Sequence, residues 1–135
     1  MIYIDTNVII AFIDELDPSH SKAIELLESL EGNRVVSNLT LVELASVYSR
    51  ANLDDPLALS LYSIKRVGAR VVDVDFNKVL QHAFKSAPSL KLRTLDLLHI
   101  IACKVIGAKL FVTFDKNIIS KSDLIDKIGI KVITR

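Results

Sequence analysis

Short runs of apolar and β-branched residues recur along the chain and predict five β-strands. They cover residues 1–4, 34–36, 70–74, 109–113 and 130–133. The segments between them carry apolar residues three and four positions apart, which is typical of amphipathic helices. Strands that alternate with helices favour an α/β fold, in which helices cover both faces of a mostly parallel sheet.

Local signals indicate where several helices begin and end. Asp17-Pro18 and Asp55-Pro56 each supply an N-cap and a first-turn proline, and the helices that follow are expected to end before Gly32 and Gly68. Pro88 is expected to end another helix. The core-facing side of that helix is predicted to comprise Phe76, Val79, Leu80, Ala83, Phe84 and Ala87.

The composition favours one domain over residues 1–135, since half of the residues are apolar. The longest apolar run, residues 8–13, is far shorter than the ~20 residues of a membrane span, and no basic stretch precedes it as in a signal peptide. We therefore expect a cytoplasmic protein with no membrane association. A lone cysteine, Cys103, excludes an internal disulfide and a cysteine-cluster zinc site.

Polar side chains follow several predicted strands at the sheet edge where α/β proteins bind ligands. Asp5 follows the first strand and Ser37 the second, while Thr113 ends the fourth and Asp115 comes two residues later. Because the carboxyl ends of parallel strands meet at one edge, these side chains are expected to lie close together. Asp5 could instead cap the helix after it, and Asp115 could be a turn residue.

Two further acids lie on predicted helices. Glu43 belongs to the helix entered through SNLTLVE, and Asp96 to the first turn of TLDLLHIIACKVI. Both have a local alternative: Thr40 and Glu43 fit a capping box, and an acid such as Asp96 is favoured at a helix N-terminus that Thr94 could cap. Whether these acids cap helices or bind a ligand is left open by their spacing.

Gathered together, the four acids would require a cation or protons. Carboxylates about 5 Å apart repel by roughly 3 kcal/mol per pair at an effective dielectric near 20. Oxygen ligands without a Cys or His cage favour Mg²⁺ or Mn²⁺, and one or two such ions suit phosphoryl chemistry. With four of the 16 acids at such a site, 12 remain against 17 Lys and Arg, so the net charge of +1 conceals a basic remainder that suits an anionic substrate.

Four segments of the chain resemble the PIN-domain family, and within it the VapC-type toxins of bacterial and archaeal toxin-antitoxin pairs. They are YIDTNVIIAF, SNLTLVEL, RTLDLLHIIA and LFVTFDKN, in this order over nearly the whole chain. The resemblance implies a three-layer α/β/α sandwich and a Mg²⁺- or Mn²⁺-dependent endoribonuclease. Such a hydrolase needs no protein nucleophile and leaves 5′-phosphate and 3′-hydroxyl ends.

The resemblance also implies roles for individual residues. It marks as metal-holding and catalytic the acids Asp5, Glu43, Asp96 and Asp115, of which Glu43 would orient ligands or water. It implies supporting roles, fixing carboxylates or binding phosphate, for the neighbouring polar residues Thr6, Asn7, Ser37 and Thr113. His99 is expected to hydrogen-bond beneath the site, because a Cys-His dyad with Cys103 lacks a third orienting group.

Contacts with the RNA backbone are hypothesised at four positions. Arg50 lies seven residues after Glu43 and shares its helical face, while the loop before Asp96 is predicted to carry Ser89, Lys91 and Arg93. Aromatic residues are few, so no RNA-stacking platform is predicted and the target sequence cannot be read.

The implied partners are RNA, a small antitoxin protein and a second copy of the chain. Apolar surface for an antitoxin is available on the helices near residues 8–31 and 40–66. The alternatives are an RNA-processing PIN nuclease outside a toxin-antitoxin system and a non-catalytic RNA- or protein-binding module. An aspartyl-phosphate phosphotransferase of the haloacid-dehalogenase type is disfavoured, because Asn7 stands where those enzymes usually carry a second aspartate.

Overall fold

Five parallel strands form the centre of the protein in a computed structural model that describes residues 1–135. The strands are β1 (Ile2–Ile4), β2 (Arg34–Ser37), β3 (Ala69–Val72), β4 (Leu110–Val112) and β5 (Lys131–Ile133). Their order is β3-β2-β1-β4-β5. The strands β2 and β3 follow on one side of β1, and β4 then pairs with the other side of β1. The strand order reverses between β1 and β4, which is where open α/β sheets bind ligands.

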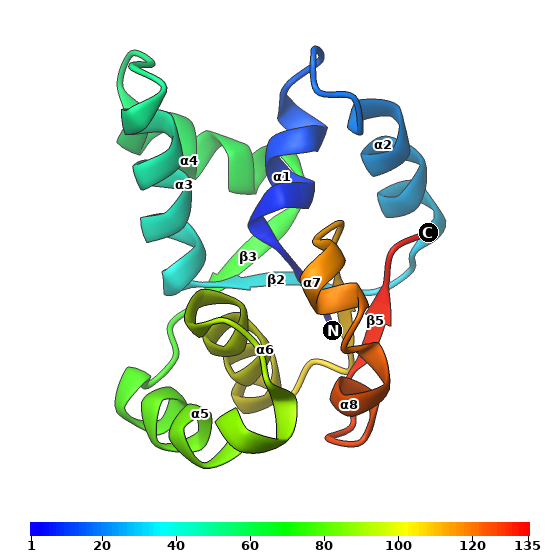
Figure 1. Ribbon diagram of the computed structural model, residues 1–135. Helices are drawn as coiled ribbons and strands as arrows, with labels where there is room; N and C mark the ends of the chain where they lie inside the picture. The colour runs from blue at the N-terminus through cyan, green and yellow to red at the C-terminus, as the bar shows by residue number, and fades with distance from the viewer.

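Helices cover both faces of the sheet and confirm the predicted three-layer α/β/α sandwich (Figure 1). One layer contains α1 (Thr6–Ile13), α2 (His20–Ser29), α3 (Asn38–Arg50) and α4 (Pro56–Arg66). The other contains α5 (Phe76–Leu90), α6 (Thr94–Ile106) and the short helices α7 (Lys116–Ile119) and α8 (Ser122–Asp126). No helix is both long and apolar enough to cross a bilayer.

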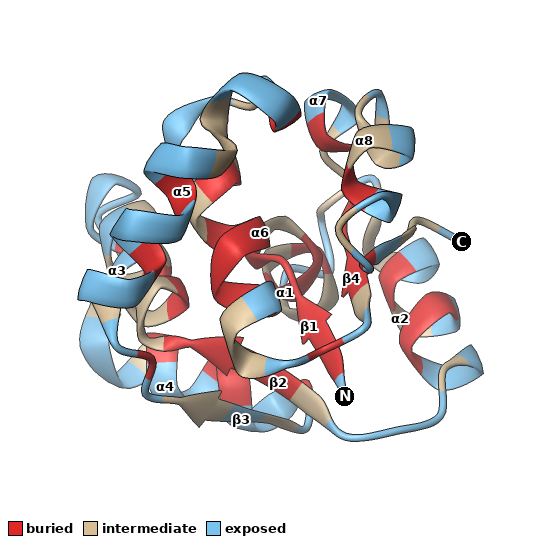
Figure 2. Cartoon of the chain, turned by 90° about the horizontal axis from the view of Figure 1, so that it is seen from below, coloured by how far each residue is buried: buried red, intermediate tan, exposed pale blue.

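The central strand β1 is buried on both faces. Ile2 and Ile4 pack into the core beneath α1 to α4, whereas Tyr3 packs into the core beneath α5 and α6. Figure 2 shows this strand and much of α6 as buried at the centre of the molecule. A strand held from both sides gives a rigid base to the residue that follows it, Asp5.

Helix α5 departs from the prediction in two ways. It continues through Pro88 to Leu90, because the proline stands in the last turn, where it costs one main-chain hydrogen bond without ending the helix. The core-facing stripe is also narrower than predicted. Val79 and Ala83 are buried, but Leu80 and Phe84, one position further round the helix, are 53% and 74% exposed.

The two Asp-Pro signals have different outcomes. Asp55 caps α4 as predicted by accepting a hydrogen bond from the amide of Ala58 at 3.3 Å. The prediction for Asp17 was wrong, because α2 begins only at His20. The Asp17 carboxylate accepts a hydrogen bond from the amide of Ser19 at 2.8 Å and so shapes a turn before the helix.

Candidate metal centre

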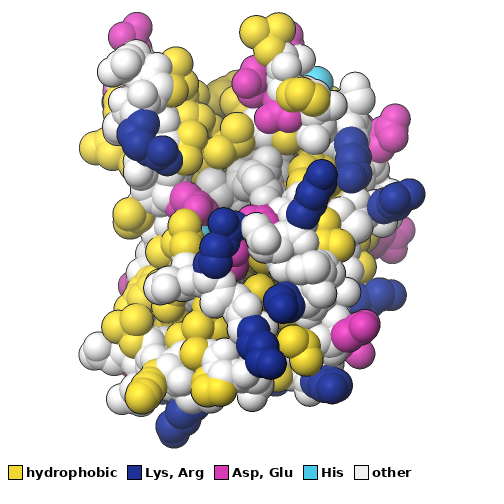
Figure 3. All heavy atoms as spheres, in the orientation of Figure 1, with side chains coloured by type: hydrophobic (Ala, Val, Ile, Leu, Met, Phe, Trp, Pro, Cys, Tyr) yellow, Lys and Arg dark blue, Asp and Glu magenta, His cyan; other side chains and the backbone are white.

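A pocket of about 220 Å³ opens at the carboxyl edge of the sheet, and all four predicted acids line it. Figure 3 shows acidic side chains beside basic ones in the middle of the face of the molecule that is turned toward the viewer. The acids come from four separate elements, namely the end of β1, α3, α6 and the start of α7. The complete lining is Asp5, Thr6, Asn7, Ile10, Glu43, Val47, Asp96, His99 and Asp115.

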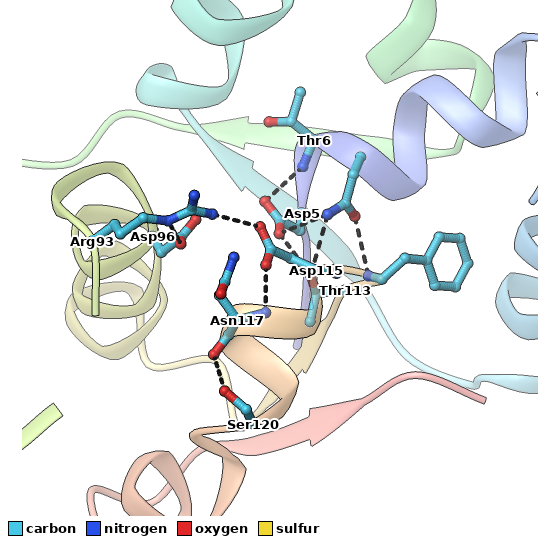
Figure 4. A network of polar contacts seen from close by, with 10 residues as sticks. Asp5, Thr6, Arg93, Asp96, Thr113, Asp115, Asn117 and Ser120 are labelled. Atoms are coloured by element: carbon cyan, nitrogen blue, oxygen red, sulfur yellow. Dashed lines mark hydrogen bonds and ion pairs between the residues drawn. The ribbon is translucent and has the colours of Figure 1, made fainter. Parts of the chain in front are cut away.

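Asp5 is the most deeply buried of these acids, with only 5% of its surface exposed. Its carboxylate caps α1 by accepting the amide hydrogen of Thr6 at 2.9 Å, and it also accepts the hydroxyl hydrogen of Thr113 at 2.8 Å (Figure 4). Burial raises the pKa of Asp5 to about 6, and the nearby His99 and the Thr113 hydrogen bond offset this only in part. The contacts around Asp5 therefore leave part of its buried charge uncompensated.

Asn7 joins the ends of β1 and β4. Its amide nitrogen donates to Asp5 and to the Thr113 hydroxyl, both at 3.4 Å, and its amide oxygen accepts from the backbone of Phe114 at 3.2 Å. The Thr113 hydroxyl oxygen in turn accepts the amide hydrogen of Asp115 at 3.0 Å. This cross-strand network fixes two of the acids relative to each other (Figure 4).

Glu43 faces the pocket from α3 and accepts a hydrogen bond from Nε2 of His99 at 2.9 Å. The capping-box interpretation of Glu43 was wrong, because α3 begins at Asn38 and the glutamate lies in the second turn. Burial by itself would raise the pKa of Glu43, but hydrogen bonding to His99, the proximity of Thr6 and the charge of His99 outweigh it and lower the pKa. Glu43 is thus held as a carboxylate.

His99 lies buried beneath the acids, as expected from its position on α6. Burial would lower its pKa, but the hydrogen bond to Glu43 and the charges of Asp5, Glu43 and Asp96 raise it overall. The second ring nitrogen, Nδ1, lies 2.8 Å from the hydroxyl of Tyr3. Tyr3 is a site residue that the sequence interpretation missed, because it reads as an ordinary apolar position of the first strand.

Asp96 and Asp115 share a basic neighbour at the rim of the pocket. Arg93 Nε lies 3.4 Å from Oδ2 of Asp96, and Nη2 lies 3.6 Å from Oδ2 of Asp115 (Figure 4). Burial and the charge of Asp115 raise the pKa of Asp96, and Arg93 opposes this shift. Asp115 also caps α7 by accepting from the amide of Asn117 at 2.8 Å, so its local and its site roles coexist.

The remaining predicted residues lie outside the pocket lining. Ser37 is buried, and its hydroxyl hydrogen-bonds that of Tyr3 at 2.8 Å rather than a carboxylate. Arg50 is exposed in the last turn of α3, outside the pocket lining. Ser89 belongs to the last turn of α5 rather than to a loop, and Lys91 caps that helix in a left-handed conformation with φ 54°.

The geometry does not support a Cys-His dyad. Cys103 is buried, and its thiol donates to the carbonyl of Ala108 at 3.6 Å. Burial raises the pKa of Cys103 to about 12, so the thiol stays protonated and unreactive at neutral pH.

The donor set fits a hard divalent cation. Ligand atoms of Asp5, Glu43 and His99 lie within 4.8 Å of one another, but both His99 ring nitrogens are already engaged, which leaves carboxylate oxygens as the free donors. The Thr6 hydroxyl also lines the pocket, buried and without a partner in hydrogen-bond geometry. Such oxygen-rich surroundings suit Mg²⁺ or Mn²⁺ and the water that these ions retain.

Comparison with known proteins identifies the family. The PIN-domain family model matches residues 2–124, so the chain belongs to the PIN-domain family. No curated protein sequence matches the chain.

Solved structures of toxins and toxin-antitoxin complexes share the fold. VapC20 of Mycobacterium tuberculosis, described as a sarcin-ricin loop cleaving toxin, is 19% identical with a TM-score of 0.71, over 89% of this chain and 94% of that chain. VapBC-1 of nontypeable Haemophilus influenzae is 20% identical with a TM-score of 0.65, over 98% and 97%. A toxin-antitoxin complex from Klebsiella pneumoniae is 13% identical with a TM-score of 0.68, over 99% and 97%. At these identities the likeness is one of fold.

Proposed function

We propose that this protein is a divalent-metal-dependent endoribonuclease and the toxin of a toxin-antitoxin pair. The observation that carries the proposal is the meeting of four acids from four elements in one pocket of a PIN-domain fold. The raised pKa of Asp5, caused mainly by burial, supports a cation at this place, because a charge-compensating ion would relieve the burial of the carboxylate.

The metal would be Mg²⁺ or Mn²⁺, held by Asp5, Asp96 and Asp115, with Glu43 orienting ligands or water. When bound, such an ion lowers the pKa of a water molecule and stabilises the charge that develops on the phosphate oxygens. The chain's own part is to fix the donors. Thr113 and the backbone of Thr6 hold Asp5, His99 holds Glu43, and the start of α7 holds Asp115.

The RNA would approach from the open side of the pocket. Arg93, with a side chain 69% exposed, lies where it can pair with a backbone phosphate. We propose the same role for Lys91, Ser89 and Arg50, which are exposed and lie outside the pocket lining. The Thr6 hydroxyl, which lines the pocket close to Glu43, would bind a phosphate oxygen or an ordered water. No protein nucleophile is required, so the products would carry 5′-phosphate and 3′-hydroxyl ends.

A groove between α1, α2 and α4 suits the proposed antitoxin. It has a volume of about 340 Å³ and combines apolar walls with polar groups from Glu15, His20 and Arg66. Similar folds have been solved as toxin-antitoxin complexes, which supports a protein partner. We propose that an amphipathic segment of a small antitoxin occupies this groove.

The exposed side of α5 suits a second copy of the chain. Leu80, Phe84 and Pro88 lie four residues apart and form one apolar stripe with a cavity beside it. Asp75 stands at the start of this helix and Lys91 at its end, so two α5 helices packed antiparallel about a two-fold axis would pair opposite charges. We therefore propose that the protein forms a homodimer through α5. We further propose that residues 1–135 form a single domain and that the protein is cytoplasmic.

The proposal is tested by incubating purified protein with end-labelled single-stranded RNA in Mg²⁺ or Mn²⁺. We expect cleavage that EDTA stops and that Asp96→Asn abolishes, while the exposed control Asp54→Asn cleaves like the wild type. Cleavage that survives both EDTA and Asp96→Asn would overturn the assignment, as would products with a cyclic phosphate. Because such enzymes can be selective, the panel should include tRNA and ribosomal RNA fragments.

The cleavage assay, together with a growth assay, separates the proposed toxin from its alternatives. Growth arrest on expression, relieved by a small protein encoded next to this one, is expected of a toxin. Cleavage without arrest favours an RNA-processing nuclease. Binding of RNA without cleavage, in every metal, favours a non-catalytic module.

A further inference from the structure

A buried chain of hydrogen bonds runs from the core to the acids. The Ser37 hydroxyl lies 2.8 Å from the Tyr3 hydroxyl, which lies 2.8 Å from Nδ1 of His99, and Nε2 of His99 lies 2.9 Å from Oε1 of Glu43. Thr40 lies at the edge of this chain, 3.5 Å from the Tyr3 hydroxyl. The chain joins β1, the consecutive elements β2 and α3, and the distant helix α6.

The donors and acceptors of this chain match along its whole length. A carboxylate only accepts hydrogen bonds, so Nε2 of His99 carries a hydrogen toward Glu43. The Tyr3 hydroxyl donates to Nδ1 when the ring is neutral and accepts from it when the ring is protonated. Ser37 complements Tyr3 in either case, since its hydroxyl can donate or accept. The network is therefore satisfied in both states, and the direction of the imidazole is fixed.

The Tyr3 ring itself has little freedom. It is fully buried, stacks on Phe111 with centroids 5.3 Å apart and planes 11° apart, and meets the His99 ring edge-on at 5.8 Å. A fixed phenol holds a fixed imidazole, and the imidazole holds the carboxylate of Glu43. That carboxylate faces Asp5, with candidate ligand atoms of Asp5, Glu43 and His99 within 4.8 Å.

We propose that Tyr3 is a positioning residue of the metal centre, which acts through His99 to hold Glu43 against Asp5. The inference rests on the proposed function, because it assigns Tyr3 to the support of that same site. Groups that orient metal ligands from behind commonly change metal affinity or activity by 10- to 100-fold when removed. Loss of the Tyr3 hydroxyl leaves Nδ1 without its partner and frees the imidazole to turn away from Glu43.

The chain provides a matched control. Tyr48 is also buried, and its hydroxyl hydrogen-bonds Ser63 at 2.8 Å, but it lies outside the pocket. Tyr3→Phe and Tyr48→Phe each delete one buried hydroxyl and keep the ring. We expect Tyr3→Phe to weaken Mn²⁺ binding, measured by isothermal titration calorimetry, by about 10-fold or more, while Tyr48→Phe leaves it unchanged. Tyr3→Phe should also lose more thermal stability than Tyr48→Phe, because the Tyr3 hydroxyl has two close buried partners and that of Tyr48 has one.

Kinetics with RNA provide a second reading. A positioning role predicts that Tyr3→Phe lowers kcat with little change in KM, because Tyr3 does not reach the RNA. Ser37→Ala keeps the phenol and removes only its outer partner, so it should give a smaller loss in the same direction, and it serves if Tyr3→Phe does not fold. The inference would be overturned if Tyr3→Phe and Ser37→Ala had the same Mn²⁺ affinity and the same kcat as the wild type. If the wild type itself neither binds Mn²⁺ nor cleaves RNA, the proposed function fails instead.

Discussion

The guanidinium of Arg93 lies 3.6 Å from the carboxylate of Asp115 and, through its Nε, 3.4 Å from that of Asp96. One flexible cation thus contacts two of the acids that the proposed metal requires. Arg93 and the metal would compete for these oxygens, and Arg93 would be released toward a phosphate of the RNA when the metal binds.

Arg93→Ala is therefore expected to tighten Mn²⁺ binding while weakening RNA cleavage at low substrate concentration. An exposed ion pair contributes about 0.2 to 1 kcal/mol, and Arg93 makes two such pairs, so the gain in metal affinity should lie between about twofold and about 30-fold. Calorimetry and initial rates measure the two effects. Lys91→Ala removes a nearby exposed cation and should leave metal affinity as it is. An unchanged or weaker Mn²⁺ affinity in Arg93→Ala would contradict the competition.

Asp5 should make the metal-free protein less stable as the pH rises. Its pKa is raised from 3.8 to about 6, mainly by burial, so the folded state binds the proton more tightly than the unfolded state does. The penalty is absent below about pH 4, grows between about pH 4 and 6, and is complete above that window, at on the order of 3 kcal/mol.

Asp5→Asn tests this linkage, because asparagine also caps helices and carries no charge. In EDTA, urea unfolding should find the variant as stable as the wild type or more stable at pH 7.5, with this advantage lost near pH 4. A stability difference between the two proteins that is constant across this range would show that burial of the Asp5 charge is not costly.

Two of the four acids could be placed from the residue pattern because each follows a predicted strand. Asp5, Thr113 and Asp115 stand at the carboxyl ends of β1 and β4, and a parallel sheet brings such ends together. Glu43 and Asp96 required the family resemblance, since their spacing fits helix capping equally well. Only the tertiary fold shows that α3 begins at Asn38, which places Glu43 beyond reach of the N-cap.

Other features depend on packing that the pattern of residues does not encode. Tyr3 alternates with Ile2 and Ile4 as any buried strand residue does, and its role becomes visible only when His99, 96 positions away, is placed beside it. On α5 a helical pattern gives the direction of the apolar side only to within about one residue, or roughly 100°. The prediction therefore assigned to the core the side chains of Leu80 and Phe84, which are exposed.

Cys103 should be dispensable for catalysis. Its thiol is buried against the carbonyl of Ala108, and burial raises its pKa to about 12. Cys103→Ala is expected to cost about 1 to 2 kcal/mol of stability, from the small cavity, and to cleave RNA at the wild-type rate. A thiol reagent should modify the protein only after unfolding. A folded Cys103→Ala protein without activity would revive the Cys-His dyad.

Phe84→Glu should dissociate the proposed homodimer, because it places a charge in the middle of the apolar stripe of α5. Sedimentation velocity should find a dimer for the wild type and a monomer for the variant. Leu57→Glu, at a position on α4 that is 67% exposed, is the matched control and should remain dimeric. A monomeric wild type would contradict the proposed homodimer. A dimer that persists in Phe84→Glu would show that the interface lies elsewhere.

The central claim is that the four acids form a divalent-metal site, and a thermal unfolding titration with Mn²⁺ tests it most directly. A ligand that binds only the folded state stabilises it by about 2.7 kcal/mol at a concentration 100 times the Kd. We expect the wild-type midpoint to rise with Mn²⁺ and to return with EDTA, and we expect no rise when Asp5→Asn and Asp96→Asn are combined. A wild-type midpoint that does not respond to Mn²⁺ or Mg²⁺, or an equal rise in the double variant, would contradict the account.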